Sequence, residues 1–159
     1  MDGDATDPPQ RPRKEKSLLA RALGYLARRE HSRAELWRRL APHAEFHDQL
    51  ERLLDELEAG RLLSDRRFTE VMVRSRGERF GAARVGQELR AHGIGAALVR
   101  EAVGGLARTE LQRARLVWRK KFASSPADAA GRARQMRFLA QRGFSADVIR
   151  RVVGGHDED

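Results

Sequence analysis

The sequence contains no cysteine. This absence excludes a disulfide framework, a thiolate nucleophile and any metal site built on cysteine. Aromatic residues are also scarce, at 6% of the chain, while arginine, alanine, leucine and glutamate dominate over β-branched residues. Because most of these abundant residues favour helices, the composition predicts an all-α protein.

Long apolar runs are missing as well. Nowhere do eighteen uncharged apolar residues follow one another, and the first sixteen residues hold no stretch that could serve as a signal peptide. We therefore expect a cytoplasmic protein that does not associate with a membrane. Residues 1–16 mix prolines with charges and lack helical periodicity, which predicts a flexible arm.

Sequence motifs for catalysis are not found. The chain has neither a G-x-x-x-x-G-K-[ST] phosphate loop nor a strand followed by G-x-G-x-x-G. His43 and His47 are four residues apart, but Pro42 interrupts the segment and HAEFH is not the H-E-x-x-H pattern. Asp55 and Glu56 alternate with leucines and are predicted to face solvent. We expect no catalytic residue, no cofactor and no metal site, and hence a protein that is not an enzyme.

The chain does contain an internal repeat. Residues 88–105 align with residues 138–155 at an offset of 50, with seven identities in eighteen positions. Each copy predicts a helix, a stop at Gly93 or Gly143, and a second helix that ends at a pair of glycines. Repeated helical units usually stack and offer a long surface to a partner.

Helical periodicity divides the chain into three units of three helices, with a short acidic tail after them. The predicted boundaries are residues 17–63, 64–107, 108–156 and, for the tail, 157–159.

Several signals predict where the helices of the first unit begin and end. Ser32 and Glu35 fit a capping box, in which hydroxyl and carboxylate each accept a backbone N–H hydrogen bond at the helix start. A third helix is predicted from about His47 to Ala59. Phe46 is expected on its apolar stripe, and Gly60 is expected to end it in the left-handed conformation.

In the later units the start signals are hydroxyl and carboxylate residues. Ser64 or Asp65 is predicted to cap a helix whose inward face includes Val71. Ser125, followed by a proline, is predicted to cap the second helix of the third unit, and Ser145 the last helix.

The net charge of +9 is concentrated toward the C-terminal end. Residues 64–107 carry eight arginines against five acids, and residues 108–156 carry twelve basic residues against three acids. This asymmetry favours a polyanionic partner, either nucleic acid or an acidic protein surface. A solvated basic face that only keeps the protein soluble is an equally good interpretation.

The string WRKKF at residues 118–122 interleaves aromatic and basic residues, as single-strand-binding proteins do. Trp118 and Phe122 continue a helical apolar stripe, which favours a place for them in the core. The charges between them, Arg119, Lys120 and Lys121, are better candidates for binding a partner.

Three strings together resemble the RecX family of bacterial RecA regulators: ALGYLARREHSRAELWRRL at residues 22–40, LLSDRRFTEVMVRSRGERFGAARVGQELRAHGI at 62–94 and RFLAQRGFSADVI at 137–149. The resemblance implies an elongated, curved array of three tandem three-helix repeats that lies in the groove of the RecA filament on DNA. It implies negative or modulatory control, mainly inhibition, of the filament's ATPase, growth, strand exchange and co-protease activity. The chain departs from the family pattern at Ser64, Ala82, Gly86 and Ala123, which affects local contacts.

On this interpretation the protein is a monomer whose partners are the RecA filament and the backbone of single- or double-stranded DNA. The residues expected to form the binding face are Arg66, Arg67, Arg74, Arg84, Arg119, Lys120 and Lys121. The alternative is a helix-turn-helix-like DNA-binding protein that acts without RecA. Against it, the last helix of each unit is short and mainly apolar or acidic, unlike a recognition helix.

Overall fold

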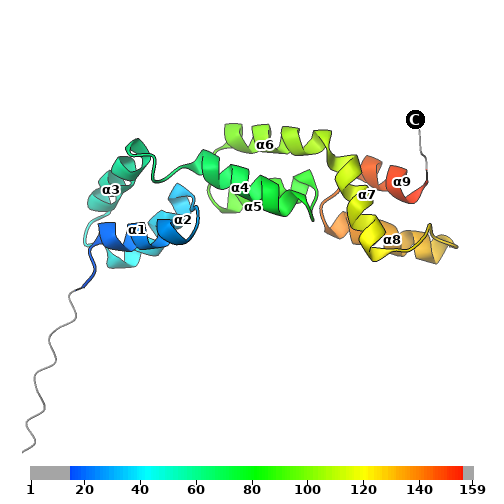
Figure 1. The fold of residues 1–159 in the computed structure, drawn as a ribbon, viewed down its shortest axis with the longest axis horizontal. Coiled ribbons are helices and arrows are strands. Elements are labelled where there is room, and N and C mark those ends of the chain that lie inside the picture. Colours follow the sequence, from blue (N-terminus) through cyan, green and yellow to red (C-terminus); the bar gives the residue numbers. More distant parts are fainter. Residues whose placement is uncertain (1–14, 156–159) are drawn as a thin grey trace, which may run out of the picture.

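A computed structural model of the chain describes residues 15–155. Within this range it contains nine α-helices, one short 3-10 helix and no strand. The helices follow one another in three groups of three along the long axis, and the middle group is raised relative to the two ends, so the row is bowed (Figure 1). The predicted all-α array of three-helix repeats is confirmed. The acidic tail and all but two residues of the predicted N-terminal arm lie outside the described range.

The first unit consists of α1 (Leu18–Arg28), α2 (Arg33–Leu40) and α3 (His47–Ala59), with η1 (Ala41–His43) between α2 and α3. Its apolar core is made of Ala22, Leu36, Leu40, Leu50, Leu54, Leu57 and Leu63. The prediction that Phe46 lies on the apolar stripe is wrong, because this residue does not join the core. It precedes α3 as the N-cap residue and is 65% exposed.

The second unit consists of α4 (Asp65–Gly77), α5 (Ala82–Ala91) and α6 (Ala96–Arg108). Its core is made of Phe68, Ala82, Val85, Leu89, Ile94, Val99 and Leu106. Val71, predicted to face inward, is 45% exposed, whereas Thr69 is buried. The helix is therefore rotated so that Phe68, Thr69 and Met72 cover the core.

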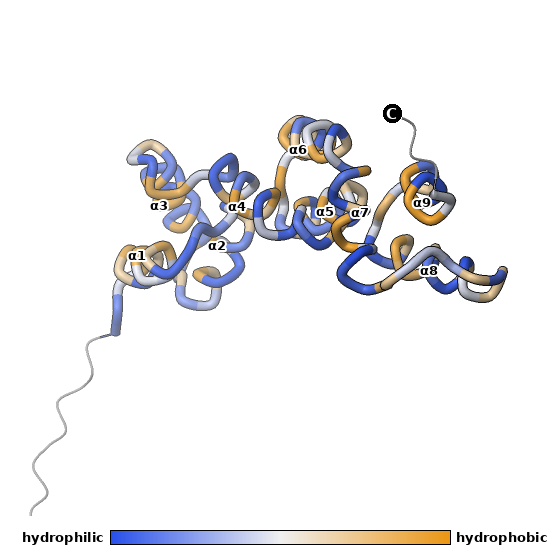
Figure 2. Tube along the Cα trace, turned by 45° about the vertical axis from the view of Figure 1, so that its right-hand side comes forward, coloured by the Kyte–Doolittle hydropathy of each residue, from blue (hydrophilic) through white to orange (hydrophobic). Residues whose placement is uncertain are grey.

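The third unit consists of α7 (Glu110–Lys121), α8 (Ala129–Gln141) and α9 (Ala146–Val153). Its core is made of Ala114, Val117, Leu139, Phe144, Ile149, Val152 and Val153, with Trp118 packed against it. Figure 2 shows orange and blue segments alternating along each helix, as expected of amphipathic helices that bury one face.

Each unit contains a helix that ends in a Schellman motif, with one residue in the left-handed conformation. After α5 this residue is Gly93 (φ 76°) and after α8 it is Gly143 (φ 82°), as predicted. After α3 the prediction is off by one position: Gly60 has φ −80°, and Arg61 has φ 60°. The backbone N–H groups of Arg61 and Leu62 donate to the carbonyls of Glu58 and Leu57, which fixes Arg61 in this conformation.

Gly104 and Gly105 do not end a helix, contrary to prediction. Helix α6 runs through them to Arg108 because Leu106, one residue further on, is buried in the core of the second unit. Tertiary packing here outweighs the low helix propensity of glycine. The equivalent pair in the third unit does follow the prediction, since α9 ends at Val153 and Gly155 has a positive φ.

Two of the predicted caps differ from the structure. Ser32 accepts the N–H of Glu35, but the Glu35 carboxylate pairs with Arg29 and so does not complete a capping box. Helix α8 is capped by Asp128, not by Ser125. The carbonyl of the preceding Ser124 instead accepts a hydrogen bond from the side chain of Gln135.

No helix among residues 15–155 combines the length and the apolar character needed to cross a bilayer.

Candidate partner-binding surface at the joints between units

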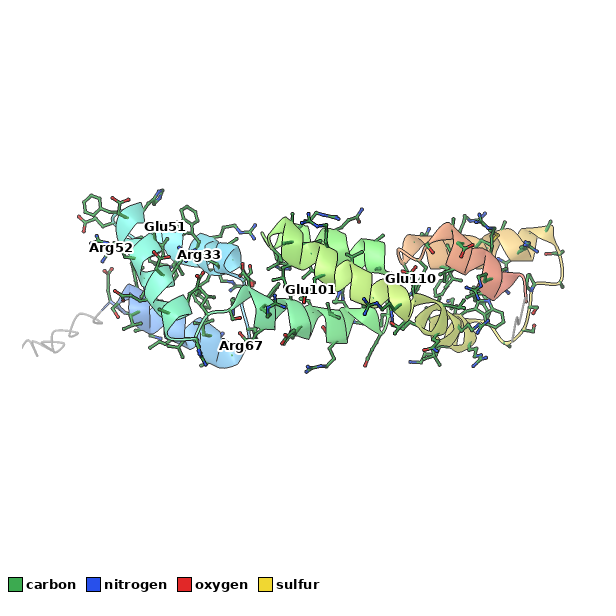
Figure 3. All side chains as sticks on the ribbon, turned by 90° about the horizontal axis from the view of Figure 1, so that it is seen from above. Arg33, Glu51, Arg52, Arg67, Glu101 and Glu110 are labelled. Carbon is green, nitrogen blue, oxygen red and sulfur yellow. The ribbon has the colours of Figure 1, made fainter. Side chains whose placement is uncertain are left out.

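The first joint, between units one and two, is fixed at the start of α2. The Ser32 hydroxyl donates to the carbonyl of His92 at 2.7 Å, and the backbone N–H of Arg33 donates to the Asp65 carboxylate at 2.7 Å. Asp65 is the first residue of α4. Its carboxylate accepts the N–H at the start of the preceding unit's second helix, which has no partner within that helix. Arg67 adds an ion pair with Glu30 at 2.9 Å, at the point where the first two units meet (Figure 3).

The second joint repeats this arrangement. The backbone N–H of Gly81 donates to the carbonyl of Arg142 at 2.8 Å, and that of Ala82 donates to the Glu110 carboxylate at 2.7 Å. Glu110 is the first residue of α7 and is only 5% exposed. Its other oxygen accepts the N–H of Ser145, so one carboxylate serves the starts of both α5 and α9.

The second helices of the three units therefore meet end to end. The loop that ends α5 lies against the first turn of α2, because a Cβ at Gly93 would lie 2.4 Å from the Cβ of Ala34. The loop that ends α8 lies against the first turn of α5 in the same way, with 2.4 Å between a Cβ at Gly143 and that of Arg84. The carboxyl ends of α5 and α8 thus each face the amino end of the second helix of the preceding unit, which aligns their dipoles favourably.

Arg113 fastens the second joint from within the third unit. Its guanidinium donates to the carbonyls of Gly77, Phe80 and Leu106, each at 2.7 Å, and so satisfies the ends of α4 and α6. Burial lowers the pKa of Arg113 from its ordinary value. Because the Arg113 guanidinium donates to three carbonyls within the protein, it is not available to a partner.

Two of the predicted binding residues on α4 form ion pairs within the chain. Arg66 pairs with Glu101 through two hydrogen bonds, and Arg67 pairs with Glu30. Arg74, nearer the end of α4, is exposed and forms no ion pair with any carboxylate of residues 15–155. A partner would have to compete with carboxylates at the first two positions but not at the third.

The other predicted residues lie near the second joint. Lys120 and Lys121 line a groove between units two and three. Arg84, on α5, lies at the same joint, where its guanidinium donates to the carbonyl of Gln141 at 3.1 Å. Arg119 is exposed on the same helix as the two lysines. The structure thus brings Arg84, Lys120 and Lys121 to the second joint, whereas Arg67 lies at the first joint and Arg66 pairs within unit two.

Arginines crowd around one aromatic ring at this joint. The guanidinium carbons of four arginines lie 4.1 to 5.7 Å from the ring centroid of Phe80, and these residues are Arg76, Arg79, Arg84 and Arg142. Arg142 also lies over Phe138, at 4.8 Å. Our sequence-based set omitted Arg142. The repeat contained a signal for it, because the residue before each glycine stop lies at a joint.

One carboxylate is engaged by this cluster. Glu88 binds Arg76 through two hydrogen bonds of 2.7 and 2.8 Å, and Arg84 lies 3.6 Å from it. The hydrogen bonds from Arg76 hold the pKa of Glu88 below its ordinary range. Glu88 therefore stays ionised at neutral pH and neutralises one of the surrounding arginines.

A second hollow, of about 520 Å³, lies at the first joint. Trp37 and Ala91 form part of its wall, and both Arg33 and Glu51 line it. Arg33 bonds to three carboxylates of α3, and Figure 3 shows it directed toward Glu51. These charges neutralise one another within the protein.

Comparisons with known proteins agree on one family. The model of the second three-helix domain of RecX matches residues 64–103, and that of the third three-helix domain matches residues 109–153. The chain is 51% identical to the regulatory protein RecX of Ralstonia nicotianae over 146 residues, which cover 92% of each protein. It is 53% identical to that of Chromobacterium violaceum, over 91% of this chain and 94% of the relative.

Solved structures are similar in fold. The crystal structure of RecX from Lactobacillus salivarius matches 88% of this chain and 94% of its own, with a TM-score of 0.73 and 19% sequence identity. A second crystal structure of a regulatory protein RecX gives the same TM-score over 87% of this chain.

Proposed function

Because the chain belongs to the RecX family, we propose that it binds the RecA filament on DNA and lowers the filament's ATPase, growth, strand exchange and co-protease activity. Its relatives are named regulatory proteins, and the resemblance implies this set of activities. The observation that carries the proposal is the row of three units held end to end by the same contacts at both joints. Such a row offers a surface long enough to touch more than one subunit of a polymer.

The proposed mechanism is bridging. A protein whose units are fixed to one another can contact neighbouring recombinase subunits at once, and so restrict the movements that accompany ATP turnover. The joints matter here, because loose units would lose the advantage of binding several subunits together.

We propose that Arg66, Arg67, Arg74, Arg84, Arg119, Lys120 and Lys121 contribute to the binding face. Arg74, Arg119 and Lys120 support this most directly, because they are exposed and form no ion pair within residues 15–155. Arg66 and Arg67 would exchange their carboxylate partners for those of the filament.

The test follows RecA ATP hydrolysis on single-stranded DNA while the purified protein is added, from far below to equal stoichiometry with the recombinase. The proposal predicts a fall in turnover that excess recombinase reverses. Inhibition at a small molar fraction would favour capping of growing ends over coverage of the groove. Unchanged turnover at saturating protein contradicts the proposal.

A further inference from the structure

The groove between units two and three is unusually rich in positive charge. It has a volume of about 270 Å³ and is lined by Arg79, Lys120, Lys121 and Arg142, with Phe138 in its wall. None of these four cations forms an ion pair with a carboxylate among the described residues. The one acid in the lining is Glu78, which is exposed. The protein thus holds several like charges together without neutralising them.

The second unit shows that the repeat does not require this surplus. At the offset of 50, Phe138 corresponds to Glu88 and Arg142 corresponds to His92. At the offset of 45 that aligns Asp65 with Glu110, Lys121 corresponds to Arg76.

The same pair of positions therefore behaves differently in the two units. In unit two it is an ion pair between α4 and α5, with 2.7 Å between Arg76 and Glu88. In unit three an aromatic ring replaces the carboxylate, and the ammonium of Lys121 lies 6.0 Å from the Phe138 centroid. The repeat can fill these positions with a neutralised pair, so the unneutralised charges in unit three point to an external anion.

We propose that this groove, formed by Arg79, Lys120, Lys121 and Arg142, binds the phosphodiester backbone of a nucleic-acid strand directly. The inference rests on the proposed function, which makes DNA a partner of the protein. It adds a direct contact between the groove and the strand that forms without the recombinase.

Three observations favour phosphodiester groups over a folded acidic protein surface. The groove admits a phosphate or two but not a folded segment. Two of its cations are arginines, whose planar forks match phosphate oxygens. The charges also continue beyond the groove through Arg84, which lies over Phe80, and through the exposed Arg119, which precedes Lys120 in the chain, and this suits a strand with one charge on each nucleotide.

The test measures binding of the full-length protein to a fluorescein-labelled single strand of about 20 nucleotides, longer than one small binding site. Fluorescence anisotropy is followed between about 50 and about 200 mM salt without recombinase. The groove variant is Lys120→Glu/Lys121→Glu. The control is Arg132→Glu/Arg134→Glu, which makes the same change in charge at exposed positions of α8 outside the groove. Thermal melting by circular dichroism establishes that both variants fold.

The groove variant is expected to lose roughly tenfold or more in affinity, and its salt slope should fall by about 1 or more, while the control loses roughly twofold. Equal losses in the two variants would overturn the proposal, because net charge alone would then explain binding. Failure of the unaltered protein to bind would overturn it as well. If the groove variant does not fold, Arg79→Ala is measured instead and should weaken binding severalfold.

Competition separates the sources of the anion. Unlabelled oligonucleotide should displace the probe far better than polyglutamate of equal charge, whereas equal displacement would replace nucleic acid by an acidic protein partner. Inhibition of RecA ATPase is measured on the same variants. If oligonucleotide binding is absent while inhibition persists, this inference fails and the proposed function stands. If inhibition is absent while oligonucleotide binding is intact, the proposed function fails and this inference stands.

Discussion

The Glu110 carboxylate accepts a hydrogen bond from the backbone N–H of Ala82 at 2.7 Å, just as Asp65 accepts one from Arg33 at 2.7 Å. In both cases the first residue of one unit's first helix caps the second helix of the unit before it. The contact is local in space but joins residues 28 and 32 positions apart. It sets how each unit is oriented on its neighbour.

Removing the Glu110 carboxylate should weaken the second joint. In Glu110→Ala the N–H groups of Ala82 and Ser145 lose their acceptor, and a buried unsatisfied donor costs about 1 to 3 kcal/mol. Glu110→Gln keeps one acceptor oxygen and should cost about half as much. Urea denaturation of both variants measures this. Equal stability of Glu110→Ala and the unaltered protein would show that the carboxylate does not hold the joint.

Gly143→Ala should destabilise the same joint by about 2 kcal/mol or more, through its positive φ and its contact with Arg84. The matched control is Gly104→Ala. Gly104 lies inside α6 with open space around it, so the new methyl group should stabilise the protein by about 0.5 to 1 kcal/mol. Both changes are read from denaturation curves. The account of the joint is wrong if the two alanines have effects of the same sign.

Arg61→Gly should stabilise the protein by about 0.5 to 1 kcal/mol, because Arg61 adopts a left-handed conformation that disfavours side chains. Arg61→Ala retains that cost and should give no such gain. Melting temperatures of the two variants distinguish a backbone effect from loss of the arginine charge. A gain from alanine as large as that from glycine would assign the effect to charge.

His31 should make stability depend on pH. It is 2% exposed, its Nδ1 lies 3.0 Å from the carbonyl of Arg29, and burial lowers its pKa below the ordinary 6.5. The folded protein thus binds fewer protons than the unfolded chain. The stability from neutral His31 is complete above pH 6.5 and is lost as pH falls through the lower folded pKa, by at most about 1.4 kcal/mol per pH unit.

His31→Asn should remove this part of the pH dependence while keeping a donor for the Arg29 carbonyl. Free energies of unfolding between about pH 7 and pH 5 provide the comparison, since carboxylates titrate mostly below that range. Parallel curves for the two proteins would show that His31 does not couple folding to protonation.

The sequence predicts those parts of the fold that depend on short-range signals. Ser32, Ser64 and Ser145 each cap a helix as expected, because a hydroxyl one position before a helix meets N–H groups within three residues. Gly93 was recognisable as a left-handed stop from its repeat partner. The prediction that Gly104 ends a helix is wrong, because the helix continues to bury Leu106, and this is a tertiary effect.

The binding face was harder to predict. Counting charges identified Lys120 and Lys121, which do line a groove. It could not show that Arg66 and Arg67 meet Glu101 and Glu30, which are 35 and 37 residues away. The Arg66 pair depends on how α4 packs against α6 within unit two, and the Arg67 pair depends on how units one and two stack. Arg142 could be found from the repeat only by comparing the joints as well as the helices.

The most direct test of the account measures binding to two substrates side by side: RecA filaments assembled on single-stranded DNA with a slowly hydrolysed ATP analogue, and the same DNA alone. Co-sedimentation at one salt concentration gives both affinities. The account predicts clearly tighter binding to the filament, with DNA alone bound more weakly through the groove. Equal affinity for the filament and the bare strand, or no binding to the filament, would contradict it.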